Sequence, residues 1–324
     1  MAIPSADIST LQPQLQTFYE ASFEQLTQDY VGTRVFPVTN VQVPTGRFGV
    51  VRLEDLLKAP QTLTRASGSG YMRDIMQFAD LSYQTVEYGI EEVVDEREMN
   101  MYQELLPAAE LATRRSALQV LMAQEVRVAA LLTDSLFYTG SFAQSLGAST
   151  WNVTTSTPII DIENAVKKAY TNCGLWPNAI IMSREVFRTL RIHPTITAAI
   201  SSTGAGDQAR MADVTTQQLS QVLDLPNVIV AGGTKNTAGV GSAATIAQIW
   251  PKSVWIGRIA ETQDMREACV GRTFHWGGDG SQPLGTVDAY YEQSMRANFV
   301  RVRHEVDNKR IYPEVGVMIA SAIA

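Results

Sequence analysis

The most regular pattern of apolar and polar positions lies in residues 108–132, AAELATRRSALQVLMAQEVRVAALL. The segment contains no glycine or proline and is rich in residues that favour helices. Five apolar residues recur at the spacing of one helix face: Leu111, Leu118, Leu121, Val128 and Leu132. The pattern predicts a single helix about 38 Å long, since each helical residue rises roughly 1.5 Å.

Two other segments alternate in the way that half-buried strands do. In residues 85–94 the apolar face carries Val86, Tyr88 and Ile90, and the other face carries Thr85, Glu87 and Glu91. In residues 299–306 one face carries Val300, Val302, His304 and Val306, and the other carries Arg301, Arg303 and Glu305. Because acidic and arginine-bearing faces attract, we expect the two segments to pair, either in one sheet or across a subunit boundary.

Residues 46–80 predict a long, projecting, two-stranded hairpin. Short alternating patches flank a glycine-rich tip, RASGSG. The segment carries five cations against the carboxylates of Glu54, Asp55 and Asp74. Besides Arg73 they are Arg47, Arg52, Lys58 and Arg65, which are candidates for contacts between subunits. A loop of this length usually serves binding or another function, although a merely exposed hairpin would show the same pattern.

Residues 1–45 have the character of a peripheral arm. Leu11, Leu15, Tyr19, Phe23 and Leu26 form one apolar helical stripe, with Thr10 as its N-terminal cap. After Tyr30, the glycines and prolines of VGTRVFPVTNVQVPTG predict an extended segment. Such an arm cannot cover its own apolar side and requires the main body or a neighbouring subunit.

Residues 151–284 resemble a separate α/β unit. NAIIMS and NVIVA are typical of short buried strands. Ser183 is expected to cap the helix REVFRTLRI, and Thr215 and Gln218 have the spacing of a capping box. A glycine-rich loop, GGTKNTAGVGSAA, separates NVIVA from TIAQIW, and GGDGSQPLG at 277–285 marks a boundary.

Composition narrows the class of protein. Hydrophobic residues make up 45% of the 324, enough to bury a core, and the formal net charge is -7. A net-acidic chain is a poor dedicated nucleic-acid binder. Arginine supplies 20 of the 26 basic residues, a bias that favours protein interfaces. No signal peptide or membrane span is recognisable, so we expect a cytosol-like setting and two inert thiols, Cys173 and Cys269.

The chain lacks a recognisable constellation for chemistry. GGTKNTAGVG does not place Lys235 where a phosphate-binding loop requires it, and the loose GxGxxA at Gly239 follows no convincing strand. His193, His275 and His304 lie in different segments and form no metal motif. We therefore expect no catalytic residue, cofactor or metal site, and a structural or binding role.

The order of these parts resembles the major capsid protein of tailed bacteriophages, with the Hong Kong bacteriophage shell fold. The resemblance covers residues from about 30 to the end and rests on the joint order of four phrases rather than on one motif. They are LSYQTVEYGIEEVVDEREM (81–99), LATRRSALQVLMAQEVRVAALLTD (111–134), WPNAIIMSREVFRTLRIHPTI (176–196) and MRANFVRVRHEVDNKRIYPEVGVMIASAI (295–323).

The resemblance implies an α+β architecture in four parts. They are an N-terminal arm at 1–45, an extended loop at 46–80, a peripheral domain at 81–150 and 286–324 around a spine helix, and an axial domain at 151–285. It implies self-assembly as pentamers and hexamers into an icosahedral shell around double-stranded DNA, without sequence-specific binding. The candidate contact residues are then the hairpin cations with Glu87, Glu91, Arg301 and Arg303.

The resemblance also implies partners: a portal, a decoration protein in some relatives, and a scaffolding protein. No long charged helical leader precedes the arm, which favours a separate scaffolding protein. The expected location is the virion, after assembly in the host bacterial cytoplasm, with no membrane contact. Two alternatives stay open: an encapsulin-type cellular nanocompartment, and a soluble α/β enzyme that binds an anionic ligand at the glycine-rich loop 231–245.

Overall fold

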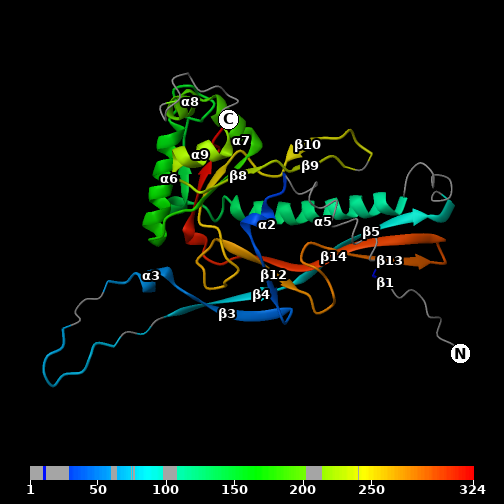
Figure 1. Cartoon of the computed structure of the whole chain (residues 1–324), viewed down its shortest axis with the longest axis horizontal. Helices are drawn as coiled ribbons and strands as arrows, with labels where there is room; N and C mark the ends of the chain where they lie inside the picture. The colour runs from blue at the N-terminus through cyan, green and yellow to red at the C-terminus, as the bar shows by residue number, and fades with distance from the viewer. Residues whose placement is uncertain are drawn as a thin grey trace.

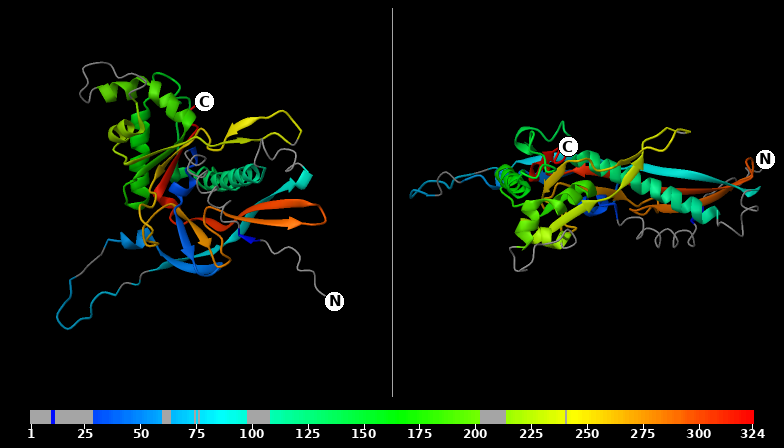
Figure 2. Two further views of the ribbon diagram at one scale, coloured as in Figure 1. Left: turned by 45° about the vertical axis from the view of Figure 1, so that its right-hand side comes forward. Right: turned by 90° about the horizontal axis from the view of Figure 1, so that it is seen from above.

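The computed structural model describes residues 10–11, 29–59, 64–73, 75, 77–97, 108–201, 214–239 and 241–324. The described part of the chain forms an elongated body with a more helical lobe at one end (Figure 1). A long loop leaves the body near this lobe, and the loop stays clear of the body in each view (Figure 2).

A long sheet covered by one helix builds the elongated part of the body. Its strands run in the order β1-β13-β14-β12-β2, and β5 pairs with β14 as well. The bounds are Thr10–Leu11 (β1), Thr286–Glu292 (β13), Ala297–Arg310 (β14), Gly271–Trp276 (β12), Val38–Val41 (β2) and Val86–Asp95 (β5). Helix α5, Ala108–Leu132, lies along one face of this sheet and buries Val300 and Val302 beneath it.

The helical lobe surrounds a second sheet with the order β6-β15-β11-β7-β8. Its strands are Ala143–Ser145 (β6), Gly316–Ala320 (β15), Val254–Gly257 (β11), Ala179–Ser183 (β7) and Asn227–Ala231 (β8). The helices of the lobe are Pro158–Cys173 (α6), Arg184–Ile192 (α7), Pro194–Ser201 (α8) and Thr216–Leu223 (α9). Two short 3-10 turns lead directly into strands of this sheet: Gly140–Phe142 (η2) precedes β6, and Pro313–Val315 (η3) precedes β15.

Two hairpins leave these sheets. Strands β3, Thr45–Val51, and β4, Phe78–Gln84, pair from Thr45↔Gln84 to Val51↔Phe78 and carry the projecting loop, which begins at α3, Leu53–Leu56. Strands β9, Thr234–Asn236, and β10, Ile246–Gln248, form the second hairpin around the glycine-rich loop. The second hairpin was not expected from the sequence.

Several local expectations are confirmed. The long helix spans residues 108–132 as predicted, the buried strands match NAIIMS and NVIVA, and the first hairpin is two-stranded. Thr215 and Gln218 form the capping box, with the Gln218 amide 3.3 Å from the Thr215 hydroxyl. These features depend on local sequence, which explains why the pattern reveals them.

Other expectations are wrong. Residues 31–41 are not an unpacked arm, because Val35 and Phe36 are fully buried and β2 joins the main sheet beside β12. Thr10 and Leu11 lie in β1 and not at a helix start, while the rest of the expected helix at 11–26 lies outside the described residues. Ser183 occupies the cap position of α7, but its hydroxyl makes no capping hydrogen bond.

A buried carboxylate of the long helix binds the backbone of residues 31 and 32. Glu125 of α5 is 2% exposed and accepts hydrogen bonds from the Val31 amide (3.0 Å), the Gly32 amide (2.6 Å) and the Trp250 indole (2.6 Å). The two amides begin α2, Gly32–Val35, whose first turn has donors that the helix itself cannot satisfy. One side chain thus joins three segments that are distant in sequence.

We expect Glu125→Ala to lower the free energy of unfolding by about 3 kcal/mol, because it leaves buried donors without an acceptor. The matched control is Gln124→Ala, since both polar atoms of the buried Gln124 side chain have no hydrogen-bond partner among the described residues. Urea denaturation at pH 7 measures both. A loss for Glu125→Ala no larger than that for the control would contradict the anchoring role.

Candidate inter-subunit surface

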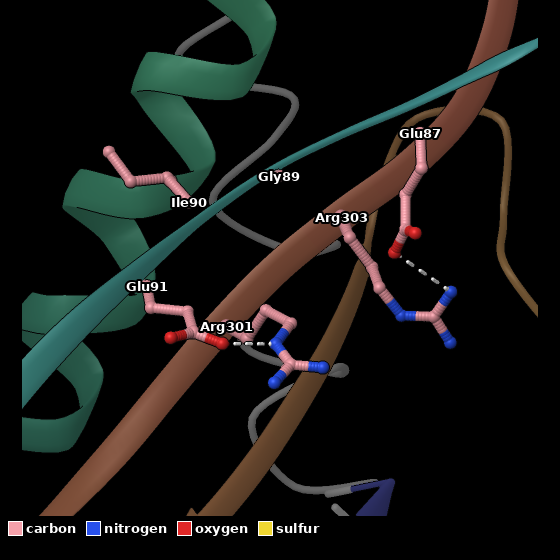
Figure 3. Close-up of a pocket in the computed structure, with 6 residues that line it drawn as sticks. All are labelled: Glu87, Gly89, Ile90, Glu91, Arg301 and Arg303. Atoms are coloured by element: carbon pink, nitrogen blue, oxygen red, sulfur yellow. Dashed lines mark hydrogen bonds and ion pairs between the residues drawn. The ribbon is translucent and has the colours of Figure 1, made fainter.

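The face of the long sheet turned away from α5 brings together four of the residues singled out in the sequence. Glu91 lies opposite Arg301, and Gly89 lies opposite Arg303, in the antiparallel register of β5 with β14. Together with Glu87 and Ile90 they line an open groove of about 480 Å³ (Figure 3). The expected pairing of acidic and arginine-bearing faces therefore occurs within one sheet of one chain.

Gly89 shapes this groove. A Cβ atom built at position 89 would lie 3.0 Å from the Arg303 Cβ and 3.1 Å from the Val302 carbonyl oxygen. A side chain at this position would therefore crowd β14. Because Gly89 has no side chain, the groove is open between Glu87 and Glu91. Figure 3 shows the Arg303 side chain on the same face of the sheet.

Arg301 is held by one strong ion pair. Its Nε donates to Glu91 Oε1 at 2.6 Å, and its guanidinium lies over the Tyr290 ring, 5.3 Å from the centroid. Burial alone would lower the pKa of Arg301, but the hydrogen bond and charge of Glu91 outweigh it and raise that pKa above its ordinary value. The side chain keeps about a third of its surface exposed, so salt can still weaken this pair.

Arg303 is more deeply buried and meets three carboxylates. Its Nε donates to Asp288 Oδ2 at 2.8 Å, and its Nη1 donates to Asp279 Oδ2. The same Nη1 lies 3.7 Å from Glu87 Oε1. Burial would raise the pKa of Asp279, but hydrogen bonds from Ser281 and from Arg303 together lower it below its ordinary value. This cluster fixes the 277–285 turn against β14, a role that the sequence pattern did not indicate.

The face remains acidic after these pairs form. Four carboxylates, those of Glu87, Glu91, Asp279 and Asp288, surround two guanidinium groups. Glu87 is the most exposed of the six side chains, at 58%. A surface with excess negative charge and an open groove is suited to a cationic segment of another molecule.

The four candidate cations of the hairpin do not line this groove. Arg47 lies 3.5 Å from Asp80 of the same hairpin, with both side chains largely exposed. Arg65 donates to the Ser69 carbonyl oxygen at 2.7 Å and stacks on Tyr71. Arg52 lines a small cavity of about 230 Å³ at the hairpin base, together with Glu54 and Glu314. Lys58 lies after α3 on the projecting loop and is exposed.

The projecting loop also exposes apolar side chains that a free loop has no reason to carry. Among the described residues of the hairpin and its loop, five are more than half exposed: Leu57, Tyr71, Met72, Ile75 and Phe78. Exposed apolar groups interleaved with cations are typical of a binding surface. Residues 64–73 of the loop carry Arg65 and Arg73 and no acidic residue, so this part of the loop is complementary in charge to the groove, although the two belong to different regions of the chain.

The remaining candidates for chemistry are structural. Cys173 and Cys269 are buried, and burial raises the pKa of both thiols. His193, which ends α7, lies 3.1 Å from the Ser156 hydroxyl. In the described ranges no cluster of three or more His, Cys, Asp or Glu residues could hold a metal ion. Nor does that part of the chain contain a helix long and apolar enough to cross a membrane.

We expect Arg303→Met to lower the free energy of unfolding at pH 7 by about 3 kcal/mol, because it leaves the buried Asp288 carboxylate unpaired. Arg301→Met should cost about 1 kcal/mol, as expected for a more exposed pair. The lowered pKa of Asp279 means that its stabilising contribution is present above the ordinary value of 3.8 and is lost as the pH falls through the lower folded-state value.

Urea denaturation of both variants at pH 7 and at pH 3 measures these differences. The excess cost of Arg303→Met over Arg301→Met should shrink at pH 3. Equal costs at pH 7 would show that the buried cluster does not hold the turn to β14.

Comparison with known proteins gives matches in structure alone. No protein-family model matches the chain, and no relative is found among the curated proteins. The fold is similar to that of a phage-related protein from Bordetella bronchiseptica RB50, with a TM-score of 0.71, 19% identity and 98% of each chain covered.

Two further structures are similar over nearly the whole chain. The putative capsid protein of a prophage from E. coli CFT073 has a TM-score of 0.57 and 14% identity, over 98% of this chain and 100% of that one. The mature capsid protein of bacteriophage PhiM1 has a TM-score of 0.55 and 10% identity, over 98% of this chain and 91% of that one. The expectation from sequence is confirmed: this chain has the α+β fold of bacteriophage capsid proteins, the Hong Kong bacteriophage shell fold.

Proposed function

We propose that the protein is a major capsid protein that self-assembles into the icosahedral head shell around the double-stranded DNA of a tailed bacteriophage. The observation that carries the proposal is the match of nearly the entire chain to a phage-related protein and to two capsid proteins, one from a prophage and one from a bacteriophage. The role is structural rather than enzymatic. The shell protein would reside in the virion after assembly in the host bacterial cytoplasm.

Each part of the chain would then have its own place in the shell. The long sheet with α5 would be the peripheral domain, and it takes in β12 (Gly271–Trp276) from the expected axial range 151–285. The helical lobe would be the axial domain that meets other copies at the centres of pentamers and hexamers, and it takes in β6 (Ala143–Ser145) and β15 (Gly316–Ala320) from the expected peripheral ranges 81–150 and 286–324. Residues 46–80 form the extended loop. The arm at 1–45 would be shorter than its sequence suggests, because residues 31–41 are already packed in the body.

The contact between copies would join the loop to the sheet. The loop, with Lys58 and with the cationic stretch 64–73 that carries Arg65, would lie on the acidic groove of a neighbour at Glu87 and Glu91. Opposite charges support this pairing, and the exposed apolar side chains of the loop would be covered in the same contact. Arg301 and Arg303 would act indirectly, by holding the acidic side chains in place.

The acidic character of the subunit also suits a shell around DNA. A chain with a net charge of -7 would enclose the genome without gripping its phosphates. Further partners of the proposed shell are a separate scaffolding protein, a portal and, in some shells of this kind, a decoration protein.

Negative-stain microscopy and light scattering of the purified protein test the proposal. We expect closed polyhedral shells of uniform size, and DNA inside particles recovered from infected cells. Particles filled with protein cargo would instead indicate a cellular nanocompartment. Small globules at every concentration and salt condition tried would contradict assembly.

Charge reversal tests the loop contact. We expect Arg65→Glu to leave the melting temperature of the subunit unchanged and to raise the concentration needed for assembly roughly fivefold, equivalent to about 1 kcal/mol per contact. Arg266→Glu is the matched control, because Arg266 is also exposed but lies outside the loop. Combining Arg65→Glu with Glu87→Arg should restore assembly. Equal defects in Arg65→Glu and in the control would contradict the contact.

A further inference from the structure

A buried polar cluster joins helix α5 to the long sheet on the face opposite the groove. His304 of β14 is fully buried, in line with the apolar Val302 and Val306 on the same side of the strand. Arg127 of α5 and Tyr88 of β5 meet the ring there. Nothing in the proposed assembly contact uses these three side chains.

The geometry requires a neutral imidazole. Arg127 Nη2 lies 3.2 Å from His304 Nε2. A guanidinium can only donate, so this hydrogen bond needs the lone pair of an unprotonated Nε2. The Arg127 guanidinium also lies over the Tyr88 ring, 3.8 Å from its centroid, and its Nε donates to Asn308 Oδ1 at 3.3 Å.

Among the described residues, no acidic side chain faces the His304 ring to stabilise a proton on it. The charged and titratable groups that face His304 are Arg127 from α5, Tyr88 from β5 and His275 from β12. Burial and the charge of Arg127 lower the pKa of His304 to about 4; a hydrogen bond with the Pro283 backbone opposes this shift without outweighing it, and His275 adds to the lowering. The Tyr88 and His304 rings meet edge to face, at a centroid distance of 6.0 Å.

We infer that the Arg127–His304 contact is an acid-sensitive joint that holds α5 on the sheet while the ring is neutral and loosens it when the ring takes up a proton. Protonation removes the acceptor and sets two cations side by side in a buried site. The joint is a property of the single subunit and does not depend on the proposed shell function.

The sign of the pH dependence follows from proton linkage. The ring takes up a proton near pH 6.5 when α5 and the sheet are apart, but only near pH 4 when they are packed. The packed state is therefore favoured fully above pH 6.5. Its advantage falls as the pH decreases from 6.5 toward 4 and changes no further below that.

The test compares dissociated wild-type subunits with His304→Gln, which can accept the same hydrogen bond but cannot be protonated in this range. Between pH 6.5 and pH 4.5 we expect the folding equilibrium constant of the wild type to fall roughly fortyfold more than that of His304→Gln. His193→Gln is the control, because His193 is also buried but lies in the other lobe, and it should keep the wild-type dependence. The same pH dependence in wild type and His304→Gln would overturn the joint.

A second measurement applies even if His304→Gln folds poorly. In the wild-type protein, the His304 ring signal in an NMR titration should have its midpoint near pH 4. In Arg127→Met, which keeps an apolar stem over Tyr88 but removes the charge, the midpoint should move upward. A wild-type midpoint near pH 6.5, or one that Arg127→Met leaves unchanged, would refute the inference.

Discussion

The structure of the elongated body depends on one strand, β14. It pairs with β5 along one edge, and with β13 and then β12 along the other. Because successive side chains point to opposite faces, β14 presents Val300, Val302 and Val306 to α5 and Arg301 and Arg303 to the outer groove. A shift of the register by one residue would bury the arginines and expose the valines, so the strand fixes both faces at once.

The sequence revealed those features that a short window determines. The helix at 108–132 and the alternation in 299–306 follow from periodicity, and the pairing of acidic with basic strands follows from charge. The sequence did not reveal contacts between distant segments. Glu125 stands between Gln124 and Val126 in the helix, and nothing in its own window shows that it accepts hydrogen bonds from residues 31 and 32 and from Trp250.

The same limit applies to the candidate site. Glu87, Glu91, Arg301 and Arg303 could be predicted to share one sheet face, because their spacing has a period of two. Asp279 could not be assigned to that face, since the turn at 277–285 gives no periodic signal, and Asp288 could not because the sequence does not show that β13 pairs with β14. The packing of residues 31–41 was also missed, because glycine and proline mark turns without showing what the turns pack against.

The projecting loop and the acidic groove connect the fold with the proposed function. A loop with exposed cations and apolar side chains has little to stabilise it within its own chain, and an acidic groove lies elsewhere on the same chain. In the proposed contact each feature would be completed by another copy, and a head-to-tail contact of this kind closes into rings when the rotation between copies allows it.

A cryo-electron microscopy reconstruction of the assembled particle tests this central claim most directly. Our account predicts that residues 64–73 of one subunit lie over β5 and β14 of its neighbour, with Glu87 in the contact. A reconstruction in which the loop rests on another surface, with the groove open to solvent, would contradict the account.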